Sequence, residues 1–206
     1  MFTSKGLLAA LLLALAPFGL ALAGEVHGRV ALGIEGTSLD RAGPVVVYLE
    51  GVDGPLVSPP RTRSLEIKQK DAAFSPLFLA IAAGETVVMP NDDVIFHNVF
   101  SYSTPNDFDL GLYPRGESRS KTFQYPGVVR IYCSIHESMN ATIFVAPSSY
   151  FAVVGTTGAF AIRDVPPGRY RLRTWNRRLP PASQVVDVGS DKPVTADLVV
   201  ASGSGP

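Results

Sequence analysis

The chain has 206 residues, of which 46% are hydrophobic and 17% are charged, a composition typical of globular domains and not of disordered chains. Its 18 basic and 18 acidic residues balance, so the sequence gives no electrostatic basis for nucleic-acid binding. The length allows one or two small domains.

Residues 1–23 have the three parts of a signal peptide. Lys5 supplies the positive charge, residues 7–15 form a short apolar core, and Ala21-Leu22-Ala23 ends the segment in the small-x-small pattern of a cleavage site. We therefore expect an exported protein, and the Ala/Leu-rich leader favours a bacterial periplasm. Loss of Lys5 leaves 17 basic against 18 acidic residues. The mature chain has no other apolar run of about 18 residues, so no membrane span is expected in it.

Beyond the leader, short runs rich in β-branched and aromatic residues recur, with Gly, Pro, Asn and Asp between them. The expected strands are residues 45–49, 86–89, 94–96, 121–125, 128–132, 141–145, 170–175 and 185–188. No stretch of the mature chain that is long enough for a good helix carries apolar residues at helical spacing. The sequence therefore predicts an all-β fold, as a sandwich or a barrel.

Four side chains with metal-binding donor atoms lie in the middle of the chain. Cys133, His136 and Met139 form the pattern Cys-x2-His-x2-Met, and His97 lies upstream. One thiolate, two imidazoles and a thioether are the ligand set of a mononuclear blue-copper centre. Each residue alone has an ordinary structural alternative, because free Cys and Met are usually core residues. The combination favours an electron-transfer metal site.

Residues 62–147 resemble the cupredoxin family. Residues 84–92 are similar to that family's "G-x-x-V-x-[WF]-x-N" strand, and residues 123–133 are similar to its "F-x-x-P-G-x-Y-x-[FY]-x-C" strand. The spacing after Cys133 is the short one of amicyanins, although Ile135 stands where many relatives carry Pro. The resemblance implies a Greek-key barrel or sandwich that holds one type 1 copper ion.

The resemblance also implies a role for each residue of the motif. His97 and His136 would give ring nitrogens, Cys133 the thiolate, and Met139 a weak axial sulfur. Asn98 would tie the two ligand-bearing segments together by hydrogen bonds; its alternative role is that of a plain turn residue.

A further implication is an apolar surface around the second histidine, where partners dock. The expected contributors are Ile135, Met139, Leu110, Leu112 and Tyr113. Burial in the domain core is the alternative for Leu110 and Leu112. A nearby acidic pair, Asp92-Asp93, fits a docking face no better than a solvated turn.

Residues 148–206 resemble the second half of a carboxypeptidase-regulatory-like (transthyretin-like) β-sandwich. The pattern runs over residues 155–172, where Pro166-Pro167-Gly168 supplies a tight turn and Phe160 and Tyr170 suit a core. The first half of such a sandwich is expected among the N-terminal β strands of residues 24–61. The cupredoxin domain would then be an insertion into a split sandwich, and residues 25–50 would pair with strands between residues 150 and 200. The alternative assigns the N-terminal strands to the cupredoxin domain and leaves a separate C-terminal β module.

A cluster of basic residues in the C-terminal segment has the spacing of an ordinary strand. Arg169, Arg171 and Arg173 alternate with Tyr170 and Leu172, so the arginines share one face of the expected strand. This pattern favours a solvated outer face over a ligand site.

The sequence contains no hydrolase, zinc-protease or phosphate-loop motif. Four protein ligands would leave no open coordination position for a substrate, so an electron carrier is expected and not an enzyme. Its partner would be another redox protein, a dehydrogenase or a cytochrome. Two alternatives stay open, a copper store or chaperone without electron transfer and a metal-free β interaction module.

Overall fold

The computed structural model describes residues 23–52 and 65–201. Residues 1–22 of the expected signal peptide and the expected domain boundary at residues 61–62 lie outside these ranges. Within the described ranges the chain forms strands β1 to β17 and one short helix, so the all-β class is confirmed. No helix in these ranges is long and apolar enough to cross a membrane.

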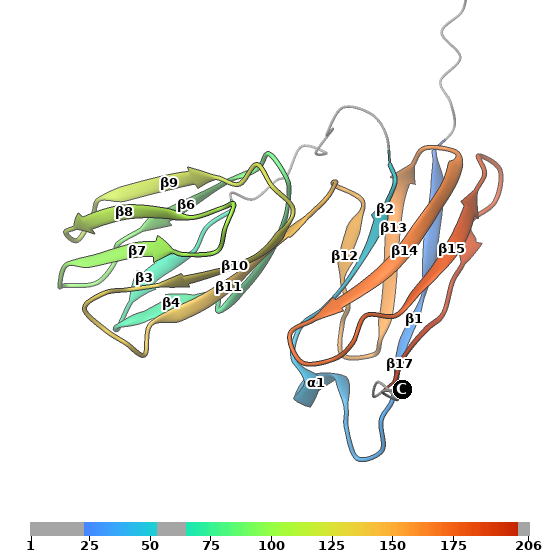
Figure 1. Ribbon diagram of the computed structural model, residues 1–206, viewed down its shortest axis with the longest axis horizontal. Coiled ribbons are helices and arrows are strands. Elements are labelled where there is room, and N and C mark those ends of the chain that lie inside the picture. Colours follow the sequence, from blue (N-terminus) through green and yellow to red (C-terminus); the bar gives the residue numbers. More distant parts are fainter. Residues whose placement is uncertain (1–22, 53–64, 202–206) are drawn as a thin grey trace, which may run out of the picture.

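One domain is a sandwich built from both ends of the chain (Figure 1). Its first sheet pairs β1 (Gly24–Gly33) with β13 (Ala159–Val165), β16 (Val194–Thr195) and β17 (Leu198–Ala201). Its second sheet has the order β12 (Phe151–Val153), β2 (Val45–Glu50), β14 (Gly168–Asn176) and β15 (Ser183–Val188). Helix α1 (Leu39–Ala42) lies between β1 and β2 in the chain.

Strand pairing ties the N-terminal strands to the C-terminal ones. Gly28 of β1 aligns with Phe160 of β13, and Leu49 of β2 aligns with Leu172 of β14. Buried residues from both ends share a single core, because alternate side chains of these strands face the same interior. This is the pairing that the split-sandwich arrangement requires. We call this unit the split sandwich, and residues 65–147, which lie between its two halves, the inserted domain.

The inserted domain has one large sheet and two small ones. The large sheet has the order β5 (Phe78–Ala82), β11 (Asn140–Ala146), β10 (Gly127–Tyr132), β7 (His97–Ser101) and β8 (Phe108–Tyr113). The small sheets are β3 (Lys68–Lys70) with β4 (Ala73–Ser75) and β6 (Thr86–Pro90) with β9 (Ser118–Thr122). Its core contains Ile67, Phe74, Val87, Met89, Val99, Phe123, Ile131 and Ile143.

The prediction of a strand over residues 94–96 is wrong, because this segment bends and β7 begins only at His97. Polar side chains hold the bend: Asn91 Nδ2 donates to the Ile95 carbonyl over 2.9 Å, and Asp93 Oδ1 accepts from the Val94 N–H over 2.7 Å. Such bonds from Asn and Asp compete with strand pairing. The strand expected over residues 121–125 likewise ends at Thr122.

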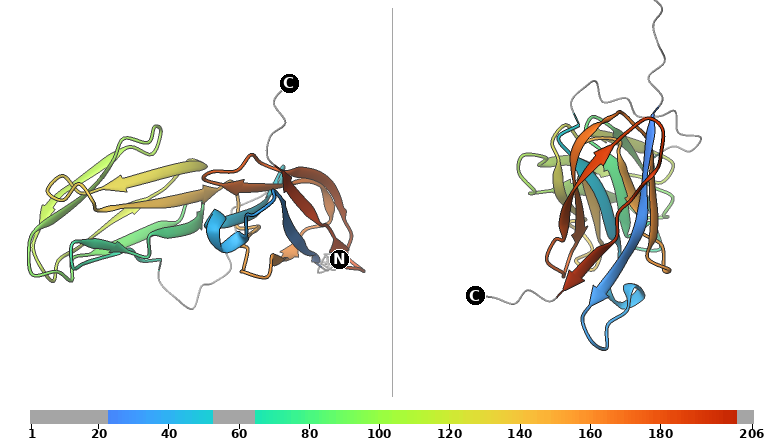
Figure 2. Two further views of the ribbon diagram at one scale, coloured as in Figure 1. Left: turned by 90° about the horizontal axis from the view of Figure 1, so that it is seen from below. Right: turned by 90° about the vertical axis from the view of Figure 1, so that its right-hand side faces the viewer.

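The two domains meet through the outer faces of their sheets and give the molecule an elongated shape (Figures 1 and 2). Val46 of the split sandwich is buried against Ala80 and Phe144 of the inserted domain. The Trp175 ring stacks on both Phe144 and Phe78, with centroid distances of 4.7 and 5.7 Å. The basic strand face expected around Arg173 is therefore covered at its Trp175 end by the inserted domain.

Candidate metal centre

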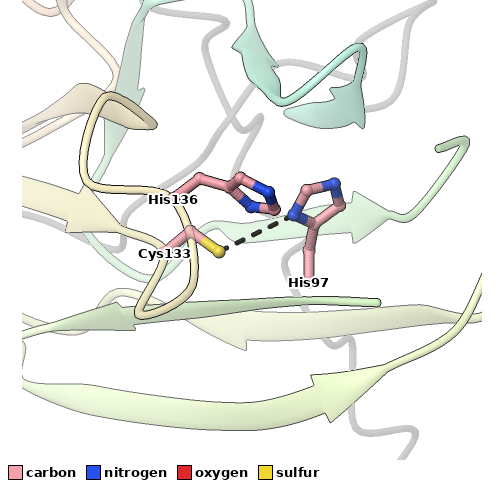
Figure 3. Close-up of side chains that lie close together, drawn as sticks. All are labelled: His97, Cys133 and His136. Atoms are coloured by element: carbon pink, nitrogen blue, oxygen red, sulfur yellow. Dashed lines mark hydrogen bonds between the residues drawn. The ribbon is translucent and has the colours of Figure 1, made fainter. Parts of the chain in front are cut away.

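Three of the predicted ligands meet at one end of the inserted domain (Figure 3). The donor atoms of His97, Cys133 and His136 all lie within 4.8 Å of one another. Cys133 Sγ lies 3.7 Å from His97 Nδ1, and the centroids of the two imidazole rings are 4.9 Å apart. The segments that carry these residues are far apart in the sequence, so the fold has brought a thiol and two imidazoles to one point.

Strand pairing explains this meeting. Antiparallel pairing aligns Tyr132 at the end of β10 with Phe100 of β7, so the chain beyond Tyr132 runs toward His97. The following loop folds back on itself. The Cys133 N–H donates to the Met139 carbonyl over 3.3 Å, and the Met139 N–H donates to the His136 carbonyl over 2.9 Å. The Cys-x2-His-x2-Met spacing thus forms a tight loop whose ends are joined.

Cys133 lies in surroundings that favour the thiolate. Burial raises the pKa of this thiol, but hydrogen bonds to the sulfur from the backbone of Asn98, Ile135 and His136 outweigh it. Together with the imidazole of His97, they lower the pKa of Cys133 to about 6. The thiolate is the form of cysteine that binds metals. The site therefore holds this ligand ready in its binding form at neutral pH.

His97 is fully buried and its ring is held by a carboxylate. Its Nε2 lies 2.9 Å from Asp93 Oδ2. The same oxygen accepts from the Ala72 N–H over 2.8 Å, and this bond, with the one from His97, lowers the pKa of Asp93 to about 2. An ionised carboxylate only accepts hydrogen bonds, so the ring proton sits on Nε2. His97 Nδ1 faces Cys133 Sγ: without a metal it can hold the proton that it shares with the sulfur, and with a metal it can offer its lone pair, as in carboxylate–histidine–metal arrangements.

His136 provides the test of whether a metal fits. Its Nδ1 is buried, and within the described ranges it has no hydrogen-bond partner. A buried polar atom without a partner is costly, and such atoms in native proteins call for an unseen water or ion. Since this nitrogen lies beside a thiolate and a second imidazole nitrogen, a soft or borderline metal such as copper fits the three donors.

Asn98 connects the two ligand-bearing segments. Its Oδ1 accepts hydrogen bonds from the backbone N–H and the hydroxyl of Ser134, over 2.8 and 2.9 Å. Asn98 follows His97 and Ser134 follows Cys133, so these bonds hold the two ligands at a fixed separation. The link is the one that the family resemblance implied.

Met139 is buried at the end of the ligand loop and packs in the core of the inserted domain. The expectation that it contributes to an exposed apolar surface is therefore wrong. The same holds for Tyr113, whose ring is fully buried in the core and whose hydroxyl donates to the Met89 carbonyl over 2.8 Å. The backbone bonds of Met139 to Cys133 and His136 keep this residue next to two of the predicted ligands, as the axial role implied for it requires.

Two of the other expected surface residues are exposed. Ile135 is 51% exposed and Leu112 is 53% exposed, whereas Leu110 packs partly against the core. Phe96, which was expected in a strand, is also an exposed apolar residue and directly precedes His97. The exposed apolar residues near the ligands are therefore Phe96, Leu112 and Ile135.

Asp93 is the functional residue that the sequence analysis missed. The pair Asp92-Asp93 gave only the choice of a docking face or a solvated turn, yet Asp93 is buried and Asp92 is exposed. The available signal was the position of a carboxylate four residues before a predicted histidine ligand. That spacing alone does not distinguish a buried partner from a surface charge.

No family model matches the chain, and no curated protein matches it in sequence. Among solved structures, it is similar to a purple cupredoxin from Nitrosopumilus maritimus, at 26% identity over 40% of this chain and 100% of that chain, with a TM-score of 0.37. It is similar to a copper-containing nitrite reductase from Thermus scotoductus SA-01, at 25% identity over 44% of this chain and 26% of that chain, with a TM-score of 0.39. A reduced single-site mutant of amicyanin is 16% identical over 48% of this chain and 97% of that chain, with a TM-score of 0.38. These likenesses are partial, and the donor geometry described above is independent of them.

Proposed function

We propose that the protein is an exported type 1 copper protein that carries single electrons between redox proteins in the periplasm, and that it is not an enzyme. The observation that carries the proposal is the convergence of one thiol and two imidazoles within 4.8 Å, with one ring nitrogen buried and unpaired among the described residues. The expected export signal, which lies outside the described residues, motivates the periplasmic location.

The proposed ligands are His97 Nδ1, His136 Nδ1, Cys133 Sγ and, as a weak axial ligand, the sulfur of Met139. When bound there, copper would supply a one-electron redox couple. The four protein ligands leave no position for a substrate, which supports a carrier and not a catalyst.

The surrounding residues are suited to keeping the site unchanged as its charge changes. Asp93 fixes the ring of His97, and Asn98 fixes the Cys133 segment against the His97 segment. Backbone N–H groups directed at the sulfur stabilise its negative charge. Ligands held in this way do not have to move when an electron arrives or leaves, which favours fast transfer.

A partner would dock where His136 approaches the surface. His136 is partly exposed, and its neighbour Ile135 presents an apolar side chain to solvent. An exposed apolar patch rimmed by polar residues is typical of a protein interaction site. A redox protein, such as a dehydrogenase or a cytochrome, is the proposed partner.

The test is to load the purified protein with copper and record its absorption and paramagnetic resonance spectra. We expect an intense blue or green colour from thiolate-to-copper charge transfer, one copper per chain, and a resonance spectrum of a type 1 site. A colourless product would refute the copper site and favour a metal-free interaction module. A coloured protein with slow electron exchange and easy release of copper would favour a copper store or chaperone.

A further inference from the structure

A groove of about 610 Å³ lies on the inserted domain beside the candidate metal centre. It is lined by residues of β7 and β10 and of the segments that follow them, including Cys133. Its volume falls in the range of small-molecule sites, which are mostly apolar with a few placed polar groups. The groove has this composition, with three aromatic side chains and two opposite charges.

The aromatic side chains form one continuous cluster, with Tyr102 edge-on to Phe100 and Tyr132 tilted against it. Phe100 is central, with its ring centroid 5.2 Å from that of Tyr102 and 5.9 Å from that of Tyr132. Phe100 and Tyr132 are aligned on neighbouring strands, so their side chains stand on the same face of the sheet. Tyr102 is 83% exposed, which leaves its ring free to contact another molecule.

At the other end of the same sheet, an aromatic face is covered by a side chain of the split sandwich. There Phe78 and Phe144 lie under the indole of Trp175, which stacks on both rings. At β7 and β10 the described residues provide no equivalent cover for Tyr102. A flat aromatic molecule in the groove would contact this cluster by stacking on one ring and meeting its neighbours edge to face, which are the contacts that aromatic rings favour.

The charges in the groove indicate the polarity of the occupant. Arg130 and Glu137 both line it, and within the described ranges neither has an ion-pair partner. One positive and one negative group favour a neutral occupant, since a net charge would be repelled by one of the two. A hydroxyl group suits both, because it accepts from a guanidinium and donates to a carboxylate.

We propose that this groove binds a neutral aromatic molecule that carries a hydroxyl group, of the phenol class. The ring packs among Phe100, Tyr102 and Tyr132, and the hydroxyl bonds to Arg130 or Glu137. Binding of this kind requires no metal, so it can hold or fail independently of the proposed copper function.

The experiment is an NMR titration of the full mature chain, free of copper and again with reduced copper. Phenol is the probe, cyclohexanol is the control that lacks an aromatic ring, and benzoate is the charged control. We expect phenol to shift the amide signals of Tyr102, Arg130 and Tyr132 saturably in both forms of the protein. Cyclohexanol should bind about twofold to tenfold more weakly than phenol, the range that one aromatic contact is worth. Benzoate should also bind more weakly than phenol, because Glu137 repels its negative charge.

Tyr102→Ala is the decisive variant, because an exposed side chain can be removed without harm to the fold. We expect it to weaken phenol binding about twofold to tenfold. At least one of the single variants Arg130→Gln and Glu137→Gln should weaken phenol binding by a similar factor, because one of these two side chains bonds to the hydroxyl. Tyr125→Ala is the matched control, since Tyr125 is also exposed on the inserted domain but does not line the groove, and it should leave affinity unchanged.

The proposal would be overturned by shifts that do not saturate, by equal binding of cyclohexanol and phenol, or by an unchanged affinity in Tyr102→Ala. Stronger binding of benzoate would also overturn it, because the groove would then select an anion.

Discussion

Nε2 of His97 lies 2.9 Å from Oδ2 of Asp93, so one of the two proposed histidine ligands is hydrogen-bonded, on the ring nitrogen that faces away from Cys133, to a buried carboxylate. This hydrogen bond fixes the ring orientation and makes Nδ1 a stronger donor. Both effects can be measured on the copper-loaded protein.

Asp93→Asn should raise the reduction potential and lower copper affinity about 10-fold to 100-fold. The neutral amide withdraws less of the Nε2 proton, so the imidazole donates less to the metal and oxidised copper is less favoured. Voltammetry gives the potential, and a competition titration gives the affinity. Asp92→Asn is the matched control: Asp92 is exposed and its carboxylate pairs with Lys68, so both quantities should stay as in the parent. Equal shifts in the two variants would show a general charge effect and not a role of the hydrogen bond.

Cys133→Ser should abolish the colour of the copper-loaded protein and leave the fold intact. A hydroxyl fits the space of a thiol but gives no thiolate-to-copper charge transfer. Absorption spectra test the colour and circular dichroism tests the fold. If the variant loses its β-sheet spectrum, the thiol has a structural role instead.

Met139→Leu should keep the colour and raise the reduction potential. Leu has nearly the volume of Met, so the buried site stays packed at a cost below about 1.5 kcal/mol. Loss of the thioether removes a weak donor that stabilises the oxidised ion. An unchanged potential in voltammetry would exclude Met139 as the axial ligand.

The thiol of the copper-free protein should titrate near pH 6, because the pKa of Cys133 is lowered to about 6 from an ordinary value of 9.0. For an acid with a lowered pKa in the folded state, the stabilisation is complete above the unfolded pKa and is lost as the pH falls through the folded one. The free energy of unfolding should therefore rise between about pH 6 and 9. The pH dependence of thiol alkylation checks the pKa, and denaturant unfolding checks the slope. Cys133→Ser should lack this contribution to the slope; a midpoint near 9 in the folded protein would contradict the expectation.

Trp175→Ala should loosen the contact between the two domains and cost about 2 to 3 kcal/mol, less than for a fully buried Trp because this side chain is partly exposed. Unfolding in denaturant should separate into two transitions, with the copper colour lost in only one of them. Val185→Ala, an exposed residue on β15 of the split sandwich, is the control and should leave unfolding unchanged. A single, unshifted transition in Trp175→Ala would mean that the stacked rings do not couple the domains.

The sequence was sufficient for features set by local periodicity and spacing. Alternation along residues 170–175 predicted the two faces of β14, and Cys-x2-His-x2-Met predicted the ligand loop. The resemblance of residues 155–172 to half of a sandwich predicted that residues 25–50 would pair with the C-terminal strands, as they do.

Features set by long-range packing could not be predicted from the sequence. Tyr113 and Leu112 are neighbours, yet one is buried and the other exposed, because the pairing of β8 with β7 decides which face each occupies. Asp93 is buried only because the Ala72 segment supplies an N–H and His97 supplies a ring N–H. Neither contact follows from the sequence around residue 93.

The split sandwich constrains the order in which parts of the chain can fold during synthesis. Arg29 and its partner Asp197 are separated by 168 positions, so β1 has its complete set of neighbouring strands only when nearly the entire chain has been made. Residues 65–147 emerge as one continuous block and can fold much earlier. Until the strands from β12 onward have been made, β1 and β2 present unpaired edges and uncovered apolar side chains, which are the features that promote aggregation. A chain that stops after β11 would therefore keep its ligand loop but lack the strands that cover β1 and β2.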